Sequence, residues 1–222
     1  MEKMAQKREL QDRYFRQAKR EGYVARSAYK LLEINKRRKL IRKGDRVLDL
    51  GCAPGSWMQV VEKIVGEDGL VVGIDLQRVS TPFGPNVHLI QGDFNEVTAA
   101  DLLGGGDELF DSVISDMAPS TTGHGDHFFS ERLCQEIINA LPDLLKPRGT
   151  CTMKVLEGET FPSLVKRMKH CFRISGAIKP DACRDVSRET YLYGIGFRPS
   201  RVRQYEERHE GEAPEPIPGW ND

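Results

Sequence analysis

Short apolar segments alternate with segments of helical periodicity along most of the chain, and this alternation is the strongest constraint on its fold. Apolar residues recur at helical spacing in 26–39, 128–145 and 160–171, which predicts three helices. Short apolar strands that alternate with helices are typical of a parallel sheet covered on both faces. We therefore expect an α/β fold with one seven-stranded, mostly parallel sheet. The predicted strands are 46–50, 70–75, 87–91, 111–116, 150–156, 172–178 and 190–197.

The connection that precedes the last strand differs from the others. Residues 179–189 contain no convincing helical pattern. A crossover between parallel strands needs about a dozen residues or more and usually contains a helix. We therefore expect the last strand to run antiparallel to its predecessor, in a hairpin-like return.

Charge is distributed unevenly along a chain whose net charge is zero. Residues 1–46 contain 16 Lys or Arg and 6 Asp or Glu, so the remainder of the chain carries a net charge of −10. Such a separation favours a polyanion-binding arm, although a solvated basic helix is an alternative. We expect a basic helical extension at 1–45, a central domain at 46–200 and an acidic, proline-containing flexible tail at 201–222.

The composition indicates a cytoplasmic protein with no membrane partner. No apolar run approaches the ~20 residues that span a bilayer, and the charged N-terminus lacks the apolar centre of a signal peptide. The five cysteines are scattered and include no C-x-x-C pair, which favours reduced thiols.

The segment "DLGCAPGSW" at residues 49–57 joins the first predicted strand to a helix-like stretch. In an open parallel sheet, ligands bind beyond the carboxyl ends of the strands, where this turn lies. The turn lacks the Lys-Ser or Lys-Thr pair of a P-loop and the third glycine of a dinucleotide fingerprint. A nucleoside ligand without phosphates therefore fits the turn best.

Polar residues also follow the second and third predicted strands. Asp75 lies 20 residues after Gly55 and can accept hydrogen bonds from both ribose hydroxyls. Asp93 offers a carboxylate to an adenine amino group, and Phe94 offers a ring to the adenine face. Each aspartate could instead cap a helix. An adenosine with a charged, phosphate-free tail is S-adenosylmethionine, and it is the ligand that we predict.

Four charged residues could converge at the same edge of the sheet. Lys154 lies inside the apolar run "CTMKVL", where a lysine is costly unless it is paired or reaches solvent at the strand end. Asp116 ends the fourth strand, and Glu189 begins the last one, whose reversal would bring it to that edge. Lys30 could join them or could be an ordinary surface lysine. Such a group could deprotonate a sugar hydroxyl, with Lys154 as the base.

Taken together, these motifs resemble the FtsJ/RrmJ-type RNA 2′-O-ribose methyltransferases from about Tyr23 to Phe197. The resemblance implies a Rossmann-like methyltransferase fold, S-adenosylmethionine as the cofactor and a catalytic tetrad of Lys30, Asp116, Lys154 and Glu189. Its motifs are "RSAYKLLEI", "LDLGCAPGSW", "GIDL", "QGDF", "SDMAPSTTG", "MKV" and "SRETYL". It implies cofactor contacts at Gly55, Trp57, Asp75, Asp93 and Asp116, to which the strand-end pattern adds Asp49, Gly51 and Phe94.

The resemblance also implies a substrate, which the spacing of residues does not show. A chain this compact resembles the bacterial members that methylate a uridine of 23S ribosomal RNA in the large ribosomal subunit. The same chemistry on tRNA or capped mRNA is an alternative, as are a non-catalytic RNA-binding protein and a nicotinamide oxidoreductase. We expect RNA contacts at Arg26, Arg37, Arg38, Lys39, Arg42 and Lys43.

One further group of polar residues could be interpreted as metal ligands. His124, Asp126 and His127 lie close together in the sequence, but no further ligand cluster supports them. We expect a polar surface loop there and no metal site.

Overall fold

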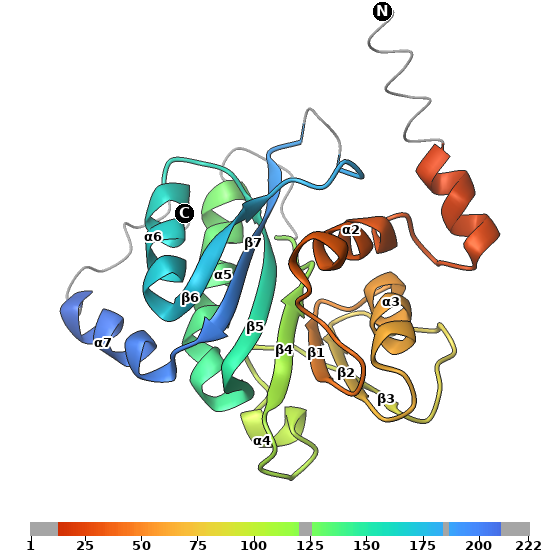
Figure 1. Cartoon of the computed structure of the whole chain (residues 1–222), viewed down its shortest axis with the longest axis horizontal. Helices are drawn as coiled ribbons and strands as arrows, with labels where there is room; N and C mark the ends of the chain where they lie inside the picture. The colour runs from red at the N-terminus through yellow and green to blue at the C-terminus, as the bar shows by residue number, and fades with distance from the viewer. Residues whose placement is uncertain (1–12, 120–125, 184–186, 210–222) are drawn as a thin grey trace, which may run out of the picture.

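A seven-stranded sheet with the strand order β3-β2-β1-β4-β5-β7-β6 forms the centre of the molecule (Figure 1). The computed structural model describes residues 13–119, 126–183 and 187–209. The strands are β1 (Arg46–Leu50), β2 (Leu70–Asp75), β3 (Val87–Gln91), β4 (Phe110–Ser115), β5 (Leu145–Leu156), β6 (Phe172–Ile178) and β7 (Glu189–Phe197). The helices are α2 (Ala28–Arg38), α3 (Ser56–Val65), α4 (Ala99–Leu102), α5 (Asp126–Leu144), α6 (Phe161–Cys171) and α7 (Pro199–His209).

The directions of the strands confirm the predicted fold class. β1 pairs in parallel with β2 and β4, while β7 runs antiparallel to both β5 and β6. In the β5–β7 register, Leu156 lies opposite Glu189 and Lys154 lies opposite Tyr191. The reversal of β7 therefore brings its first residue to the sheet edge at which the parallel strands end.

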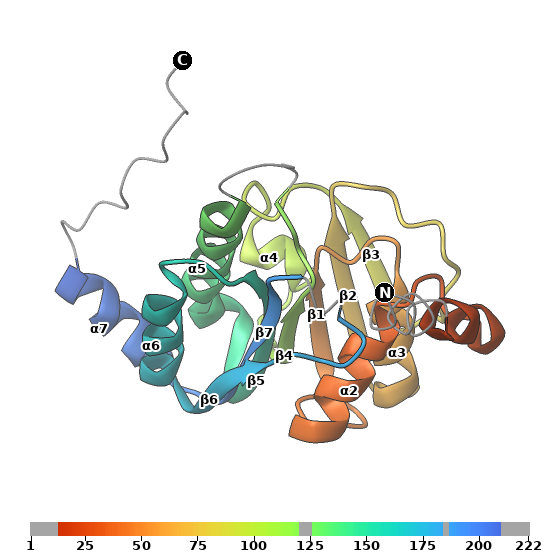
Figure 2. The same cartoon turned by 90° about the horizontal axis from the view of Figure 1, so that it is seen from above.

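Helices cover both faces of the sheet, as seen from above in Figure 2. Leu31 and Ile34 of α2 and Val61 of α3 pack with sheet residues such as Val47 on one face. On the other face, α5 and α6 pack on a second core cluster that contains Val113 and Met153. The structure thus has two apolar layers, one on each side of the sheet.

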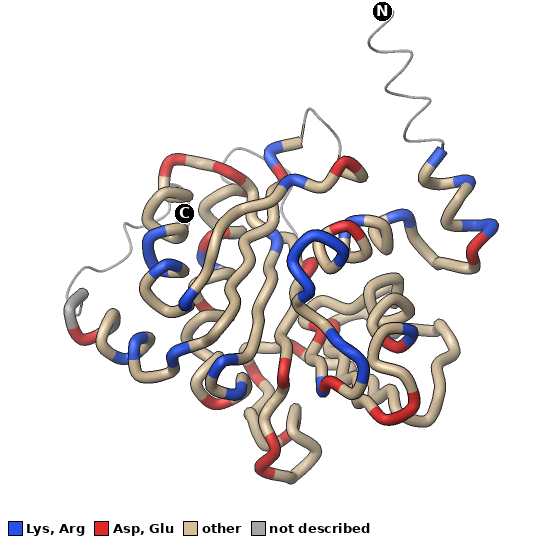
Figure 3. Tube along the Cα trace, in the orientation of Figure 1, with Lys and Arg blue, Asp and Glu red and all other residues tan. Residues whose placement is uncertain are grey.

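The expected domain boundary at residue 45 does not separate two units. Leu31, Ile34, Leu40 and Ile41 are buried and belong to the same core cluster as β1 and α3. Residues 13–21 form a further helix, which is attached through a small cluster that contains Ala18 and Tyr29. Figure 3 shows Lys and Arg residues at intervals along the trace of this region. The basic segment is therefore partly a structural component of the domain.

The prediction of a flexible tail that begins at residue 201 is wrong for residues 201–209. They belong to α7, which packs against α5 and α6. Val202 is fully buried in the core cluster on that face of the sheet. The rest of the predicted tail, 210–222, lies outside the described residues. Within the described part of the chain, no helix combines the length and apolar character that crossing a membrane requires.

Candidate active site

A cavity of about 820 Å³ opens beyond the carboxyl ends of β1, β2, β3 and β4. Ligand sites in proteins commonly measure about 300–1,000 Å³, so a nucleoside-sized molecule fits here. The cavity lies where the fold class predicts a ligand, at the end of the sheet from which the glycine turn departs. Five of the predicted cofactor residues line it: Gly51, Asp75, Asp93, Phe94 and Asp116.

Two glycines keep the turn close to its neighbours. Gly51 has a φ of +76°, and a Cβ atom there would lie 2.4 Å from Cγ of Met117, another residue of the cavity wall. Gly55 has a φ of +108° and is not among the residues that line the cavity; Thr81 and Phe83 lie 3.2 and 3.1 Å from a Cβ position there. A side chain at either glycine would be strained by the positive φ, and at Gly51 it would also collide with Met117.

The two strand-end aspartates hold their own loops and also face the cavity. Asp75 accepts hydrogen bonds from the amides of Ala53, at 2.9 Å, and Gln77, at 2.7 Å. Asp93 accepts one from the amide of Asn95 through Oδ1, at 2.9 Å. Within the described residues, Oδ2 of Asp93 has no such partner and remains available to a ligand. Each aspartate can thus bind the backbone of its own loop and also contact a ligand in the cavity.

Asp49 and Trp57 do not line the cavity. The Asp49 carboxylate is completely buried, and neither oxygen has a hydrogen-bond partner among the described residues. Burial raises the pKa of Asp49 well above its ordinary value, and the nearby carboxylates of Asp116 and Asp75 add to this shift. Trp57 is also buried, and its Nε1 donates to the backbone carbonyl of Ser27, at 2.9 Å. These two residues support the site from beneath it.

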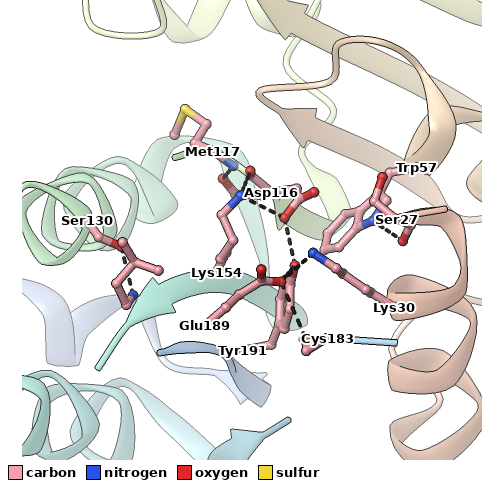
Figure 4. Close-up of polar contacts among 12 residues, drawn as sticks. Ser27, Lys30, Trp57, Asp116, Met117, Ser130, Lys154, Cys183, Glu189 and Tyr191 are labelled. Carbon is pink, nitrogen blue, oxygen red and sulfur yellow. Dashed lines mark hydrogen bonds and ion pairs between the residues drawn. The ribbon is translucent and has the colours of Figure 1, made fainter. Parts of the chain in front are cut away.

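Four charged side chains from distant parts of the chain meet beside the cavity (Figure 4). Nζ of Lys30 lies 2.5 Å from Oε1 of Glu189, and Nζ of Lys154 lies 3.0 Å from Oδ1 of Asp116. Lys154 also donates to the backbone carbonyl of Asp116. The structure brings together all four residues of the tetrad that the resemblance implied, and Asp116 connects them to the cavity wall.

Tyr191 joins the two ion pairs, and the sequence analysis did not identify it. Its hydroxyl lies 2.7 Å from Oδ1 of Asp116 and 2.6 Å from Oε1 of Glu189 (Figure 4). Tyr191 lies two residues after Glu189 on β7, and residues two apart point to the same face of a strand. That spacing was the available signal, but a tyrosine in an apolar strand resembles an ordinary core residue.

The electrostatic environment fixes the protonation of three groups at the site. Burial alone would raise the pKa of Glu189, but the Lys30 ammonium and the hydrogen bonds from Lys30 and Tyr191 lower it, so this carboxylate is ionised. Burial and the adjacent carboxylates raise the pKa of Tyr191 far above its usual range. Burial also raises the pKa of Cys183 to about 12, and its thiol lies 3.4 Å from Oε1 of Glu189. Tyr191 and Cys183 therefore remain neutral donors.

The position of Lys30 depends on how α2 begins. Ser27 precedes α2, and its Oγ lies 2.7 Å from Oγ of Ser56, the first residue of α3. The backbone carbonyl of Ser27 accepts the Trp57 hydrogen bond, and the Trp57 ring lies 5.6 Å from the Tyr191 ring. α3 and β7 thus hold the first turn of α2, from which Lys30 reaches Glu189.

The residues that we expected to contact RNA lie in or beside α2. Arg26 is half-buried, whereas the other five are exposed. Arg37 forms ion pairs with Glu33 and Asp181, and Lys43 lies 3.9 Å from Asp68. The Arg38 guanidinium lies over the Tyr193 ring, 4.3 Å from its centroid. Part of this predicted RNA surface is therefore already engaged within the protein.

The predicted absence of a metal site falls partly on residues outside the described ranges. His124 lies outside them, while Asp126 and His127 begin α5. Among the side chains that the structure describes, no group of three or more His, Cys, Asp or Glu residues could hold a metal ion.

A model of the FtsJ-like methyltransferase family matches residues 23–197. The chain belongs to this family. The predictions of an FtsJ-type methyltransferase and of S-adenosylmethionine as its cofactor are confirmed. The match covers the tetrad, the glycine turn and every strand of the sheet.

Individual proteins show the same likeness. Ribosomal RNA large subunit methyltransferase E of Desulfatibacillum aliphaticivorans is 43% identical over 188 residues, which are 82% of this chain and 89% of the relative. The crystal structure of a ribosomal RNA methyltransferase from Plasmodium falciparum is 28% identical, has a TM-score of 0.68 and covers 79% of this chain and 98% of its own. Fibrillarin of Aeropyrum pernix, solved with S-adenosyl-L-methionine natively bound, is 19% identical with a TM-score of 0.54, covers 76% of this chain and 73% of its own, and shares the fold.

Ser56 stands where the FtsJ-like family usually has the second glycine of "APGGW". The described non-glycine residues with positive φ are Lys39 and Arg148, so Ser56 is not among them. Its hydroxyl instead contacts Ser27 and links α3 to α2. The substitution therefore introduces no backbone strain and adds a contact near Lys30.

Proposed function

We propose that the protein transfers a methyl group from S-adenosylmethionine to a ribose 2′-hydroxyl of RNA, namely a uridine of 23S ribosomal RNA in the large ribosomal subunit. The tetrad is the observation that carries this proposal. Its two lysine–carboxylate ion pairs are joined through Tyr191 and lie beside a nucleoside-sized cavity. Membership of the FtsJ-like family and relatives named as ribosomal RNA large subunit methyltransferases support the choice of substrate.

The residues that line the cavity fit the cofactor. Asp75 and the free oxygen of Asp93 would bind the ribose hydroxyls and the adenine amino group, and the Phe94 ring would contact the base. Gly51 lets the turn approach Met117, another residue of the cavity wall, more closely than any side chain would permit. When bound, S-adenosylmethionine supplies a methyl group on a positively charged sulfur, which is already a good leaving group.

The tetrad fixes the position of Lys154, the proposed base. A phenol has one hydroxyl proton, so Tyr191 can donate to only one of its two carboxylate neighbours. Its hydroxyl lies within hydrogen-bond distance of both carboxylates and therefore holds Asp116 and Glu189 at fixed positions. Asp116 in turn contacts Nζ of Lys154, at 3.0 Å, so the position of the proposed base depends on Tyr191.

As the general base, Lys154 would take the proton of the ribose hydroxyl, and the oxygen would attack the methyl carbon. Lys30 and Glu189 would hold the tetrad in place and keep a positive charge beside the developing oxyanion. Positioning of the two reactants supplies much of the rate in such a transfer.

The test is to map 2′-O-methyl positions in ribosomal RNA with and without the protein and to measure methyl transfer by Lys154→Ala. We expect one uridine of the large-subunit RNA to gain a methyl group. Lys154→Ala should lower transfer by about 10²–10⁴-fold, the usual contribution of a general base. Cofactor binding, measured by calorimetry, should stay close to that of the parent.

Lys146→Ala is the matched control. Lys146 lies at the other end of β5 and pairs with Asp111 and Glu108, far from the tetrad, so its loss should leave transfer unchanged. Unchanged turnover in Lys154→Ala would remove the proposed base. Methylation of tRNA alone would overturn the ribosomal substrate, and tight NAD binding without transfer would favour an oxidoreductase.

A further inference from the structure

A second basic segment lies within the part of the chain that carries a net negative charge. Residues 166–203 contain 10 Lys or Arg and 3 Asp or Glu. The net charge of residues 47–222 does not reveal this segment, because acidic residues predominate before and after it. Basic charge is therefore concentrated in two parts of the sequence.

Six basic side chains of this segment are exposed and unpaired among the described residues, and all of them except Arg188 lie on α6, β6 or α7. None of them has an ion pair or a side-chain hydrogen bond to the described residues, unlike Arg37 and Lys43 near α2. We call the five residues on these three elements the α6–α7 basic surface: Lys166 and Lys169 on α6, Arg173 on β6, and Arg201 and Arg203 on α7. Their charges are free to interact with an external anion.

Arg198 holds the three elements of this surface together. Its guanidinium donates to the backbone carbonyls of Lys169, His170 and Phe172, at 3.0, 2.9 and 2.5 Å. Its amide donates to the carbonyl of Cys171, at 2.9 Å. The end of α6, the start of β6 and the start of α7 are thereby fixed to one another, and Figure 3 shows Lys and Arg gathered there. The surface is built on ordered elements.

The α6–α7 basic surface lies at the opposite end of β7 from the tetrad. Glu189 begins β7, and Arg198 directly follows its last residue. At a rise of about 3.3 Å per residue, this separation is about 30 Å. That distance is close to one turn of a nucleic-acid duplex, about 10 base pairs. A nucleotide bound at the tetrad therefore cannot reach this surface, and only a distant part of a large RNA can.

We propose that the α6–α7 basic surface binds the phosphate backbone of a second segment of a large folded RNA substrate. This inference rests on the proposed function, because it extends the same RNA beyond the active site. Unpaired lysines and arginines bind phosphates without reading sequence, and they gain affinity by releasing counterions. The surface therefore selects for the size and shape of the substrate.

The test compares two RNAs and two variants. The RNAs are full-length large-subunit ribosomal RNA and a short hairpin, below about 10 base pairs, that contains the mapped methylation site. One variant changes Lys166, Lys169, Arg173 and Arg201 to Gln. The matched control keeps the charge through Lys166→Arg, Lys169→Arg, Arg173→Lys and Arg201→Lys. Affinity is measured as a function of salt, and methyl transfer is measured on both RNAs.

We expect the Gln variant to bind the full-length RNA about 10–100-fold more weakly, and the slope of log affinity against log salt to fall by about 3. Its binding and methylation of the hairpin should match the parent, which also shows that it is folded. The charge-retaining control should match the parent on both RNAs. Unchanged binding of full-length RNA by the Gln variant would overturn the proposal, as would an equal loss on both RNAs.

Three outcomes decide between this inference, the proposed function and a protein partner. If the parent methylates the hairpin but the Gln variant binds full-length RNA normally, the second surface is wrong and the function stands. If the parent neither binds nor methylates either RNA, both fail. If the Gln variant loses only the binding of an acidic protein, the surface serves a protein partner and the RNA proposal is wrong.

Discussion

Tyr191 shows how a neutral side chain can organise four charged ones. Its hydroxyl contacts both carboxylates of the tetrad, and its ring packs against Trp57 beneath the helix that carries Lys30. Removal of the hydroxyl would leave Asp116 and Glu189 each without one hydrogen bond in a partly buried site. Tyr191 is therefore a fifth member of the site, which holds the two carboxylates of the tetrad in position.

We expect Tyr191→Phe to lower kcat by about 10–100-fold, because misplaced catalytic groups lose rate through poorer positioning. KM for RNA and for the cofactor should change little, and the pH profile of kcat should shift because Glu189 loses a hydrogen bond that lowers its pKa. The measurement is steady-state methyl transfer across pH. Tyr193→Phe, on the same face of β7, is the control. Equal rates and pH profiles in Tyr191→Phe and the parent would show that Tyr191 does not position the tetrad.

Asp49 makes a prediction about stability, because its raised pKa means that the folded state holds its proton more tightly than the unfolded chain does. Its contribution is therefore most favourable below the unfolded-state pKa of about 3.9 and is lost as the pH rises toward the folded-state pKa. Asp49→Asn should remove this loss. The free energy of unfolding of the variant should therefore rise relative to that of the parent as the pH increases, by at most about 1.4 kcal/mol per pH unit.

Denaturant unfolding at several pH values, without cofactor, measures this difference. Asp68→Asn, at an exposed partner of Lys43, is the control and should follow the parent at every pH. Parallel pH curves for Asp49→Asn and the parent would show that the buried carboxyl has found a partner and has an ordinary pKa.

At the scale of elements, the sequence predicted the strands better than the chain end. All seven strands and the reversal of β7 followed from local apolar runs and from the missing helix in 179–189. α7 was missed because acidic residues and prolines further along the chain dominated the composition of 201–222. Among the described side chains of α7, only Val202 is buried, and one buried position gives too weak a helical signal to outweigh them.

Val202→Ala tests whether α7 belongs to the folded domain. We expect the free energy of unfolding to fall by about 1.5–3 kcal/mol, from the lost apolar contact and the cavity left behind. Gln204→Ala, at an exposed position of the same helix, should change it by less than about 0.5 kcal/mol. Denaturant unfolding measures both variants. An unchanged free energy of unfolding in Val202→Ala would place the domain boundary before residue 201.

At the scale of the whole molecule, charge could be predicted only as far as sequence averages allow. The first basic segment stood out because it is contiguous, although α2 turned out to belong to the core. The α6–α7 basic surface could not be seen in the same way, because its residues are dispersed among apolar core positions on three elements. Burial, which decides what Asp49 and Trp57 do, has no direct signature in the sequence.

The place of β7 in the sheet has a consequence for the timing of activity during synthesis. Its neighbours β5 and β6 are both made earlier, yet β6 pairs with the sheet only through β7. A nascent chain that ends before Glu189 therefore lacks one member of the tetrad and leaves the edge of β5 open. The ribosome must therefore translate most of the message before the product can transfer a methyl group, and shorter nascent chains should be inactive.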